Sequence, residues 1–210
     1  MQVVRLRYAA VVLAAGKSQR MGRNKLLLEV SGRTLLDHVL DALERSGVDE
    51  IFVVLGHKPD DLKPIVESHK AKIVINLNYE EGMTSSIKAG FRDVKADATF
   101  IVLGDQLGLE AKLLKRMSEL MTTNLDILIV SPIFEGKRGH PILVRRNLFP
   151  EIMALNKAQS LKDVVLRHEM QHGLVEGAVW SVTDIDTAED FDKAKKLWLS
   201  SKNDQTIFFK

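Results

Sequence analysis

The sequence predicts a doubly wound α/β fold, in which a mostly parallel sheet lies between two layers of helices to give three layers. Apolar runs occur at 9–15, which has no polar interruption, at 51–55 and, after Thr99, at 100–103, as expected of strands buried on both faces. Segments with the apolar spacing of helices alternate with these runs. Because parallel strands are joined by right-handed crossovers, this alternation favours βαβ units.

In the first half of the chain the predicted elements follow one another closely. The first strand ends at Gly16, and apolar spacing predicts a helix from Thr34 to Ser46, with Thr34 and Asp37 as a capping box and Gly47 as its end. We then expect a strand at 51–55, a short helix at 60–68, a strand at 72–77, a helix at 84–91 opened by a Thr or Ser cap, a strand at 99–103, a helix at 110–121 and a strand at 127–130 that Pro132 ends.

The second half of the chain is predicted to complete the sheet. We expect a strand at 141–145, a helix at about 160–167, a final strand at about 182–185 and a helix at 187–199. No linker, repeat or low-complexity tract interrupts the chain, so we expect a single domain over 1–210 with a tail at 200–210.

Composition narrows the classes of function. The 210 residues are 45% hydrophobic and 28% charged, with a net charge of +2, which gives no footprint for nucleic acid. The absence of cysteine excludes disulfides, thiolate zinc sites and a cysteine nucleophile. No apolar run approaches the roughly 20 residues that span a bilayer, and the N-terminus lacks the features of a signal peptide. We therefore expect a cytoplasmic protein that does not enter a membrane.

The segment after the first strand has the composition of an anion-binding loop. Residues 16–25 contain two glycines, a serine and four cations, at the edge where a parallel sheet presents the carboxyl ends of its strands. Gly16 and Gly22 lack a Cβ, so backbone N–H groups can approach anionic oxygens, and Arg20 and Lys25 can add full charges. The spacing fits neither a Walker A loop nor a dinucleotide fingerprint. A glycine-rich turn with solvated cations is the alternative.

Carboxylates are expected at the same edge of the sheet. Asp105 follows a buried strand beyond a glycine, and one carboxylate together with nucleotide phosphates is how Mg²⁺ is usually held. Asp184 and Asp186 alternate along the last predicted strand, which places both on one face, where they would repel each other without a nearby cation. The alternative for Asp105 and for Asp186 is that each caps the helix that follows.

A third polar group surrounds the start of the helix at 84–91. Gly82 allows close approach of the backbone, and Ser86 lies among hydroxyl side chains at a helix start, an arrangement that suits hydrogen bonding to a base or ribose. A plain capped helix is the alternative. Gly139 and His140 lie in a later polar segment, where a lone histidine is more often a loop residue than a catalytic base.

Several of these stretches resemble one family. The pattern Leu-Ala-Ala-Gly-x-Ser-x-Arg-Met-Gly-x-x-Lys over 13–25 resembles the signature loop of the MobA-like nucleotidyltransferases, and its Ala-Ala-Gly form is similar to the molybdenum cofactor cytidylyltransferase branch. Gly-Asp at 104–105, Asn76 with Gly-Met-x-x-Ser at 82–86, Gly-His-Pro at 139–141 and Asp-x-Asp-Thr-x-Glu-Asp at 184–190 are similar to further motifs of this family or its relatives.

The resemblance implies a Rossmann-like fold of the nucleotide-diphospho-sugar transferase type. It also implies Mg²⁺-dependent transfer of a nucleoside monophosphate from an NTP to a small phosphorylated acceptor, with release of pyrophosphate. By this match the nucleotide-binding residues are Leu13, Ala14, Ala15, Gly16, Ser18, Arg20, Lys25, Asn76, Gly82 and Ser86. The catalytic residues are Lys25, Arg20 and Asp105, the metal ligands are Asp105 and Asp186, and the acceptor side holds His140 and Gly139. Residues 8–132 would form the nucleotide-binding core and 133–199 the acceptor side with the closing strand and helix.

The identities of both substrates remain open at this point. CTP is favoured as the donor, because the guanylyltransferase branch more often has Leu-Ala-Gly-Gly, and GTP is the alternative. Residues 155–163 stand where the cofactor cytidylyltransferases carry Gly-Asp-x-Gly-Ala-Arg, so a sugar or polyol phosphate competes with molybdopterin as acceptor. The alternative outside enzymes is a nucleotide-binding regulatory domain. The oligomeric state and the role of the tail are not predicted.

Overall fold

A computed structural model describes the backbone of residues 5–207 and the side chains of residues 5–201. Within this part of the chain, eight strands form one sheet in the order β10-β7-β9-β6-β1-β4-β5, and β8 pairs with β7. The strands are β1 (Tyr8–Ala14), β4 (Glu50–Leu55), β5 (Lys72–Ile75), β6 (Ala98–Leu103), β7 (Ile129–Phe134), β8 (Lys137–Arg138), β9 (Ile142–Arg145) and β10 (His172–Glu176). A separate hairpin is formed by β2 (Glu29–Val30) and β3 (Arg33–Thr34).

The central strands are parallel, which confirms the predicted mostly parallel sheet. β1 pairs in parallel with β4 on one side and with β6 on the other, and β4 pairs in parallel with β5. The insertion of β9 interrupts the parallel order, because β9 runs antiparallel to both β6 and β7. β7 and β10 then form another parallel pair, and the short β8 pairs antiparallel with β7.

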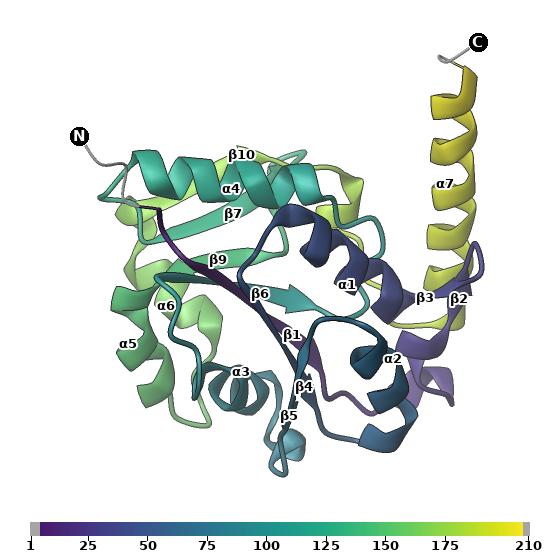
Figure 1. Ribbon diagram of the computed structural model, residues 1–210, viewed down its shortest axis with the longest axis horizontal. Helices are drawn as coiled ribbons and strands as arrows, with labels where there is room; N and C mark the ends of the chain where they lie inside the picture. The colour runs from purple at the N-terminus through teal and green to yellow at the C-terminus, as the bar shows by residue number, and fades with distance from the viewer. Residues whose placement is uncertain (1–4, 208–210) are drawn as a thin grey trace.

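Helices cover both faces of the sheet (Figure 1). One layer contains α1 (Leu35–Ser46), α2 (Lys63–Ser68) and α4 (Ala111–Thr123), and the other contains α3 (Met83–Phe91), α5 (Phe149–Ala154) and α6 (Leu161–Arg167). The side chains of β1 explain the two layers, since Ala10 and Val12 pack in the first core while Ala9 and Val11 pack in the second. Because alternate residues of a strand face opposite sides, a strand buried on both faces is apolar throughout.

The last helix, α7 (Ala188–Ile207), projects from the body of the molecule (Figure 1). At its base, Phe191 and Ala194 pack with Trp180, Leu28 and Ile185 in a third, smaller core. The helix runs beyond Leu199, where the sequence pattern places its end. Much of the tail at 200–210 is therefore helical in its backbone, and residues 208–210 lie outside the described part.

The start of α1 is formed as the sequence predicts. The Oγ1 atom of Thr34 accepts a hydrogen bond from the backbone N–H of Asp37 at 3.1 Å, and the Asp37 carboxylate accepts one from the backbone N–H of Thr34 at 3.0 Å. Gly47 ends the helix in the left-handed conformation, with φ of 82°. This confirms the predicted capping box and its glycine stop.

Replacement of Thr34 by alanine should destabilise the protein by about 1 kcal/mol, because a backbone N–H at the helix start loses its partner. For a chain of this length the melting temperature should fall by about 2–4 °C in a thermal unfolding experiment. Thr123→Ala, at the exposed end of α4, is the matched control and should shift it less. An equal shift in both variants would contradict the proposed contribution of the capping box.

Two predicted strand features are wrong. Residues 182–185 do not form a strand, and the strand beside β7 is β10, which the sequence analysis did not predict. The alternation that suggested the strand is real, since Ile185 is buried between two more exposed aspartates, but it occurs in an extended loop without a ladder. Pro132 does not end β7, which continues to Phe134 and pairs with β10 as far as Ile133. The Pro132 carbonyl also accepts a hydrogen bond from Gly139.

Two helix starts also differ from the prediction. The residue before α3 is Gly82, in a conformation with φ of 97°, and no side chain caps the helix, so the expected Thr or Ser cap is wrong. The helix expected at 60–68 is split into a 3-10 turn at Pro59–Asp61 and α2. The predicted positions of α1, α4 and α6 agree to within a few residues, α7 begins where predicted and runs on to Ile207, and α5 was not predicted.

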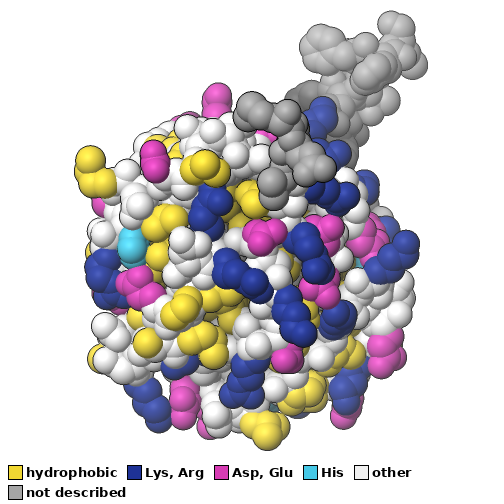
Figure 2. Space-filling model, turned by 60° about the vertical axis from the view of Figure 1, so that its left-hand side comes forward, with side chains coloured by type: hydrophobic (Ala, Val, Ile, Leu, Met, Phe, Trp, Pro, Cys, Tyr) yellow, Lys and Arg dark blue, Asp and Glu magenta, His cyan; other side chains and the backbone are white. Residues whose placement is uncertain are grey.

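The surface carries both signs of charge. Figure 2 shows Lys and Arg side chains interspersed with Asp and Glu on the face that it presents, with apolar side chains between them. This agrees with the small net charge. None of the helices in the described part has the length and hydropathy needed to cross a membrane.

Candidate active site

The order of the strands creates a switch point between β1 and β6. From β1 the chain continues to β4 and β5 on one side and then returns to β6 on the other side of β1. The backbone N–H of Gly104 donates to the Leu13 carbonyl at 3.1 Å, so the two strands stay together at their carboxyl ends. In open α/β sheets, ligands bind in the crevice at this point.

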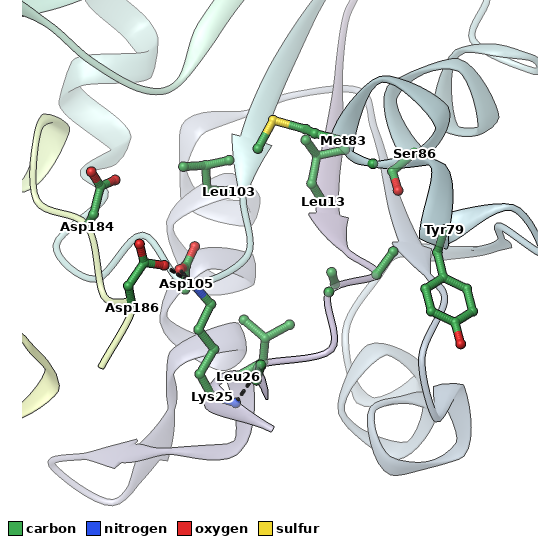
Figure 3. A pocket seen from close by; sticks show the side chains of 15 residues that line it. Leu13, Lys25, Leu26, Tyr79, Met83, Ser86, Leu103, Asp105, Asp184 and Asp186 are labelled. Atoms are coloured by element: carbon green, nitrogen blue, oxygen red, sulfur yellow. Dashed lines mark hydrogen bonds and ion pairs between the residues drawn. The ribbon is translucent and has the colours of Figure 1, made fainter. Parts of the chain in front are cut away.

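A cavity of about 470 Å³ opens there (Figure 3). Of the residues predicted to bind nucleotide, eight line it, namely Leu13, Ala14, Ala15, Gly16, Ser18, Lys25, Gly82 and Ser86. Asp105, Asp184 and Asp186 line it as well. Segments that are far apart in the sequence therefore meet in one cavity.

The loop after β1 turns sharply at the edge of this cavity. Ser18 adopts the left-handed conformation, with φ of 49°, and Gly22 does so again after a short 3-10 turn. The Ser18 hydroxyl accepts a hydrogen bond from the backbone N–H of Lys25 at 3.1 Å, which ties the two ends of the loop together. A Cβ at Gly16 would meet no atom within 4 Å, so packing within the protein does not require this glycine and the space beside it is open.

Lys25 is the centre of the charged end of the cavity. Its Nζ forms an ion pair with the Asp105 carboxylate, lies 3.4 Å from an Asp186 carboxylate oxygen, and donates to the Ile185 carbonyl at 2.8 Å. Arg20 does not line the cavity, but its guanidinium lies 2.9 Å from the other Asp186 oxygen. The Asp105 side chain is the more enclosed carboxylate, at 15% exposure against 40% for Asp186.

The two carboxylates fit a divalent cation. Asp105 and Asp186 face a common position, which the Lys25 ammonium group occupies, so the site accommodates positive charge between them. Carboxylate oxygens are the ligands that Mg²⁺ prefers, together with phosphate oxygens and water. Asp184 lines the same cavity and adds a third carboxylate, although the motif match favours Asp186 over it.

A different acidic group outside the cavity already has protein partners. Asp41, Glu44 and His69 bring one ligand atom each within 4.8 Å of one another. Arg33 pairs with Asp41 at 2.6 Å, and Glu44 accepts a hydrogen bond from the backbone N–H of Lys70 at 2.8 Å. The contacts of these side chains within the protein, around α1, therefore explain why the acidic group is there.

Asn76 lies behind the cavity and does not line it. Its Nδ2 donates to the hydroxyls of Ser85 and Ser86 at 2.9 and 3.1 Å, and its Oδ1 accepts from the backbone N–H of Asn78. Because Asn76 is buried and Ser86 lines the cavity, the amide fixes a cavity residue in place.

Four further cavity residues were not singled out from the sequence. Leu26, Leu103, Tyr79 and Met83 line the cavity alongside the predicted ones. Leu26 and Leu103 are direct neighbours of predicted residues, and Met83 is part of the motif at 82–86, so a sequence signal could have found all three. Tyr79 has no such signal, because its place depends on packing against residues far from it in the sequence.

The two residues predicted for the acceptor side lie in a second cavity, of about 440 Å³. Gly139 and His140 line this cavity, and Met83 lines both. A Cβ at Gly139 would lie 1.9 Å from the Ser181 carbonyl oxygen, so glycine is required there. Burial lowers the pKa of His140, and its carbonyl accepts a hydrogen bond from the Gln106 side chain at 2.6 Å. Burial therefore favours the neutral form of His140, and the hydrogen bond to its carbonyl holds its backbone in place.

The fold and the cavity define an α/β enzyme with a cationic loop and carboxylates at its switch point. Residues 10–172 match the family model described as the MobA-like NTP transferase domain. That match covers more than half of the 210 residues. The chain belongs to the MobA-like NTP transferase family and is a nucleotidyltransferase-family enzyme.

The individual relatives carry different names. The chain is 27% identical over 188 residues to the molybdenum cofactor cytidylyltransferase of Escherichia coli (strain K12), a match covering 89% of this chain and 94% of that protein. It is 28% identical over 204 residues to the nicotine blue oxidoreductase of Paenarthrobacter nicotinovorans, covering 90% and 93%. The crystal structure of Rv0371c from Mycobacterium tuberculosis H37Rv superposes with a TM-score of 0.79 at 25% identity, covering 91% and 98%.

Proposed function

We propose that this enzyme transfers a nucleoside monophosphate, with CMP favoured, from an NTP to a small phosphorylated acceptor and releases pyrophosphate. The observation that carries the proposal is the contact of Lys25 with both Asp105 and Asp186 at the charged end of a cavity at the switch point. Such a transfer needs a cation that can bind the triphosphate, and it needs carboxylates that can hold a metal ion.

In the proposed reaction an oxygen of the acceptor phosphate attacks the α-phosphorus of the NTP. The new P–O bond joins the nucleoside monophosphate to the acceptor, and the bond to the leaving pyrophosphate breaks. Backbone N–H groups of residues 16–18 would hold the phosphates, Lys25 would neutralise charge near the α-phosphate, and Arg20 would hold the outer phosphates. A phosphate nucleophile is ionised at neutral pH, so positioning and charge neutralisation suffice without a strong general base.

Asp105 and Asp186 would hold Mg²⁺ in this proposal. Bound Mg²⁺ supplies neutralisation of the charge that develops on the phosphate oxygens. The carboxylates contribute by facing one position at the mouth of the anion-binding loop. Lys25 would leave them for the phosphates when nucleotide and metal enter together.

The donor is testable by thermal shift. We expect CTP in the presence of Mg²⁺ to raise the melting temperature more than GTP, ATP or UTP does, since a ligand at about 100 times its Kd stabilises by about 2.7 kcal/mol. The Ala14-Ala15-Gly16 form of the loop motivates the choice of CTP. A larger shift with GTP would favour the guanylyltransferase alternative, and equal shifts for CTP and ATP would contradict the assignment of CTP.

The acceptor is proposed to bind on the side of the second cavity, where Gly139 and His140 lie. The stretch that departs from the cofactor cytidylyltransferases packs beside this cavity, since Thr84, which lines it, donates to the Gln159 carbonyl. Molybdopterin, suggested by the name of the Escherichia coli relative, and a sugar or polyol phosphate are therefore both candidates.

A pyrophosphate-release assay over a panel of acceptors tests the proposed function. The enzyme with Mg²⁺ and CTP is offered molybdopterin, sugar phosphates and polyol phosphates in turn. The proposal predicts acceptor-dependent release of pyrophosphate with at least one phosphorylated acceptor and none with its dephosphorylated form. Failure of every phosphorylated acceptor with every NTP would contradict the proposal.

A further inference from the structure

The cavity at the switch point has a charged end and an uncharged end. Lys25, Asp105 and Asp186 lie together at one end in Figure 3, and Tyr79 and Ser86 lie at the other. If the triphosphate occupies the charged end, as proposed above, the base of the nucleotide must reach toward the uncharged end. A base is flat and uncharged, so the side chains there decide how tightly it is held.

The ring of Tyr79 is firmly seated at that end. A Cβ added at Gly56, just after β4, would lie 2.5 and 2.7 Å from the Cβ and Cγ atoms of Tyr79 and 2.9 Å from the Cβ of Ala15. Such distances are closer than packed atoms tolerate, so only glycine at position 56 leaves room for Tyr79 in this place. The Tyr79 hydroxyl lies 3.5 Å from Nδ1 of His57, the residue that follows Gly56.

A second contact holds Tyr79 from the side of the anion-binding loop. The Nζ of Lys17 lies 5.7 Å from the centre of the Tyr79 ring, within the range of a cation–π contact. The same ammonium group pairs with the Glu80 carboxylate at 2.5 Å. Lys17 thus joins the loop that would hold the phosphates to the turn that carries Tyr79.

We infer that Tyr79 forms the wall of the cavity that contacts the nucleotide base, and that Gly56 and Lys17 are positioning residues for its ring. This inference rests on the proposed function. Contact between a base and an aromatic ring is tolerant of base identity, because every base has a π face. Tyr79 therefore sets the affinity for the donor nucleotide and leaves the choice between CTP and GTP to other groups.

The test compares ligands with and without a base. Binding of CTP, GTP and inorganic tripolyphosphate is measured by titration calorimetry with Mg²⁺ for the wild-type protein, Tyr79→Leu and Tyr79→Phe. Stacking on an aromatic ring corresponds to about a 5- to 150-fold change in affinity. Tyr79→Leu should weaken CTP and GTP alike by about tenfold or more and leave tripolyphosphate unchanged, and Tyr79→Phe should bind all three like the wild type.

Gly56→Ala provides an independent variant in which the tyrosine is retained and displaced. Gly56→Ala should show the same selective loss of nucleotide affinity. If Tyr79→Leu does not fold, Gly56→Ala still tests the inference. Unchanged CTP binding in these variants, or an equal loss for CTP and tripolyphosphate, would overturn the inference. Wild-type protein that binds neither CTP nor tripolyphosphate would instead contradict the proposed function, so the two failures are distinguishable.

Discussion

Asp105→Asn should lower the rate of nucleotidyl transfer by about 10²- to 10³-fold, the loss typical of removing one preorganised electrostatic contact at a reacting centre. Asp105 follows the carboxyl end of β6 and is the more enclosed of the two carboxylates that face Lys25. Asparagine keeps the shape and removes the charge that would hold Mg²⁺. The rate of pyrophosphate release at saturating NTP measures the effect.

Two controls separate this loss from damage to the fold. Asp192→Asn changes an exposed carboxylate on α7 outside the cavity and should leave the rate unchanged. The melting temperature of Asp105→Asn should stay near that of the wild type or rise, because Lys25 retains its contact with Asp186. A near-normal rate for Asp105→Asn would exclude Asp105 as the principal metal ligand.

Lys25→Ala should cause a loss of similar size. Lys25 contacts both carboxylates. Its backbone N–H donates a hydrogen bond to the Ser18 hydroxyl, which fixes its position in the loop. Its removal takes away the charge that would neutralise the triphosphate in the transition state, so turnover should fall more than the affinity for NTP. Steady-state kinetics with varied NTP separates the two effects.

Lys63→Ala is the charge-matched control for this variant. Lys63 pairs with Asp60 on the exposed surface of α2 and lies outside the cavity. Its replacement should leave both kinetic constants unchanged. If Lys25→Ala raised the KM for NTP with turnover intact, Lys25 would contribute to binding only, and the proposed role in the transition state would be wrong.

The core of the fold could be predicted because its local signals and its packing agree. The apolar run of β1 is continuous since both faces of the strand are buried, and Thr34, Asp37 and Gly47 mark the ends of α1 through local hydrogen bonds and backbone conformation. The position of the anion-binding loop followed from the same logic, because a parallel strand buried on both faces must present its end at the sheet edge.

The errors arise where a pattern has two possible causes. Around position 185, the buried side chain of Ile185 lies between two more exposed aspartates. An extended loop produces this alternation as readily as a strand does. The direction of β9 depends on pairing with β6 and β7, which no local pattern records. Pro132 shows the converse, since a residue that usually ends a strand lies inside β7, beyond the end of the ladder with β9 and within the pairing with β10.

The cavity was anticipated through short motifs, and Tyr79, the missed residue without a sequence signal, is placed by tertiary packing. Asn76, which was expected to bind nucleotide, lies behind the cavity and donates to the hydroxyl of Ser86, which lines it. Tyr79 reaches the cavity only because Gly56, which α2 and β5 separate from it in the sequence, leaves room for it. Such pairings depend on three-dimensional contacts between distant segments and leave no periodic signal.

The most direct test of nucleotidyl transfer follows the α-phosphate of the donor. CTP labelled at the α-phosphate is incubated with the enzyme, Mg²⁺ and the acceptor that gives the highest release of pyrophosphate, and the products are separated. The proposed reaction predicts that the label appears in the acceptor product in equal amount to the unlabelled pyrophosphate. Label that remains in CTP, or that appears only as free CDP or CMP, would contradict transfer to an acceptor.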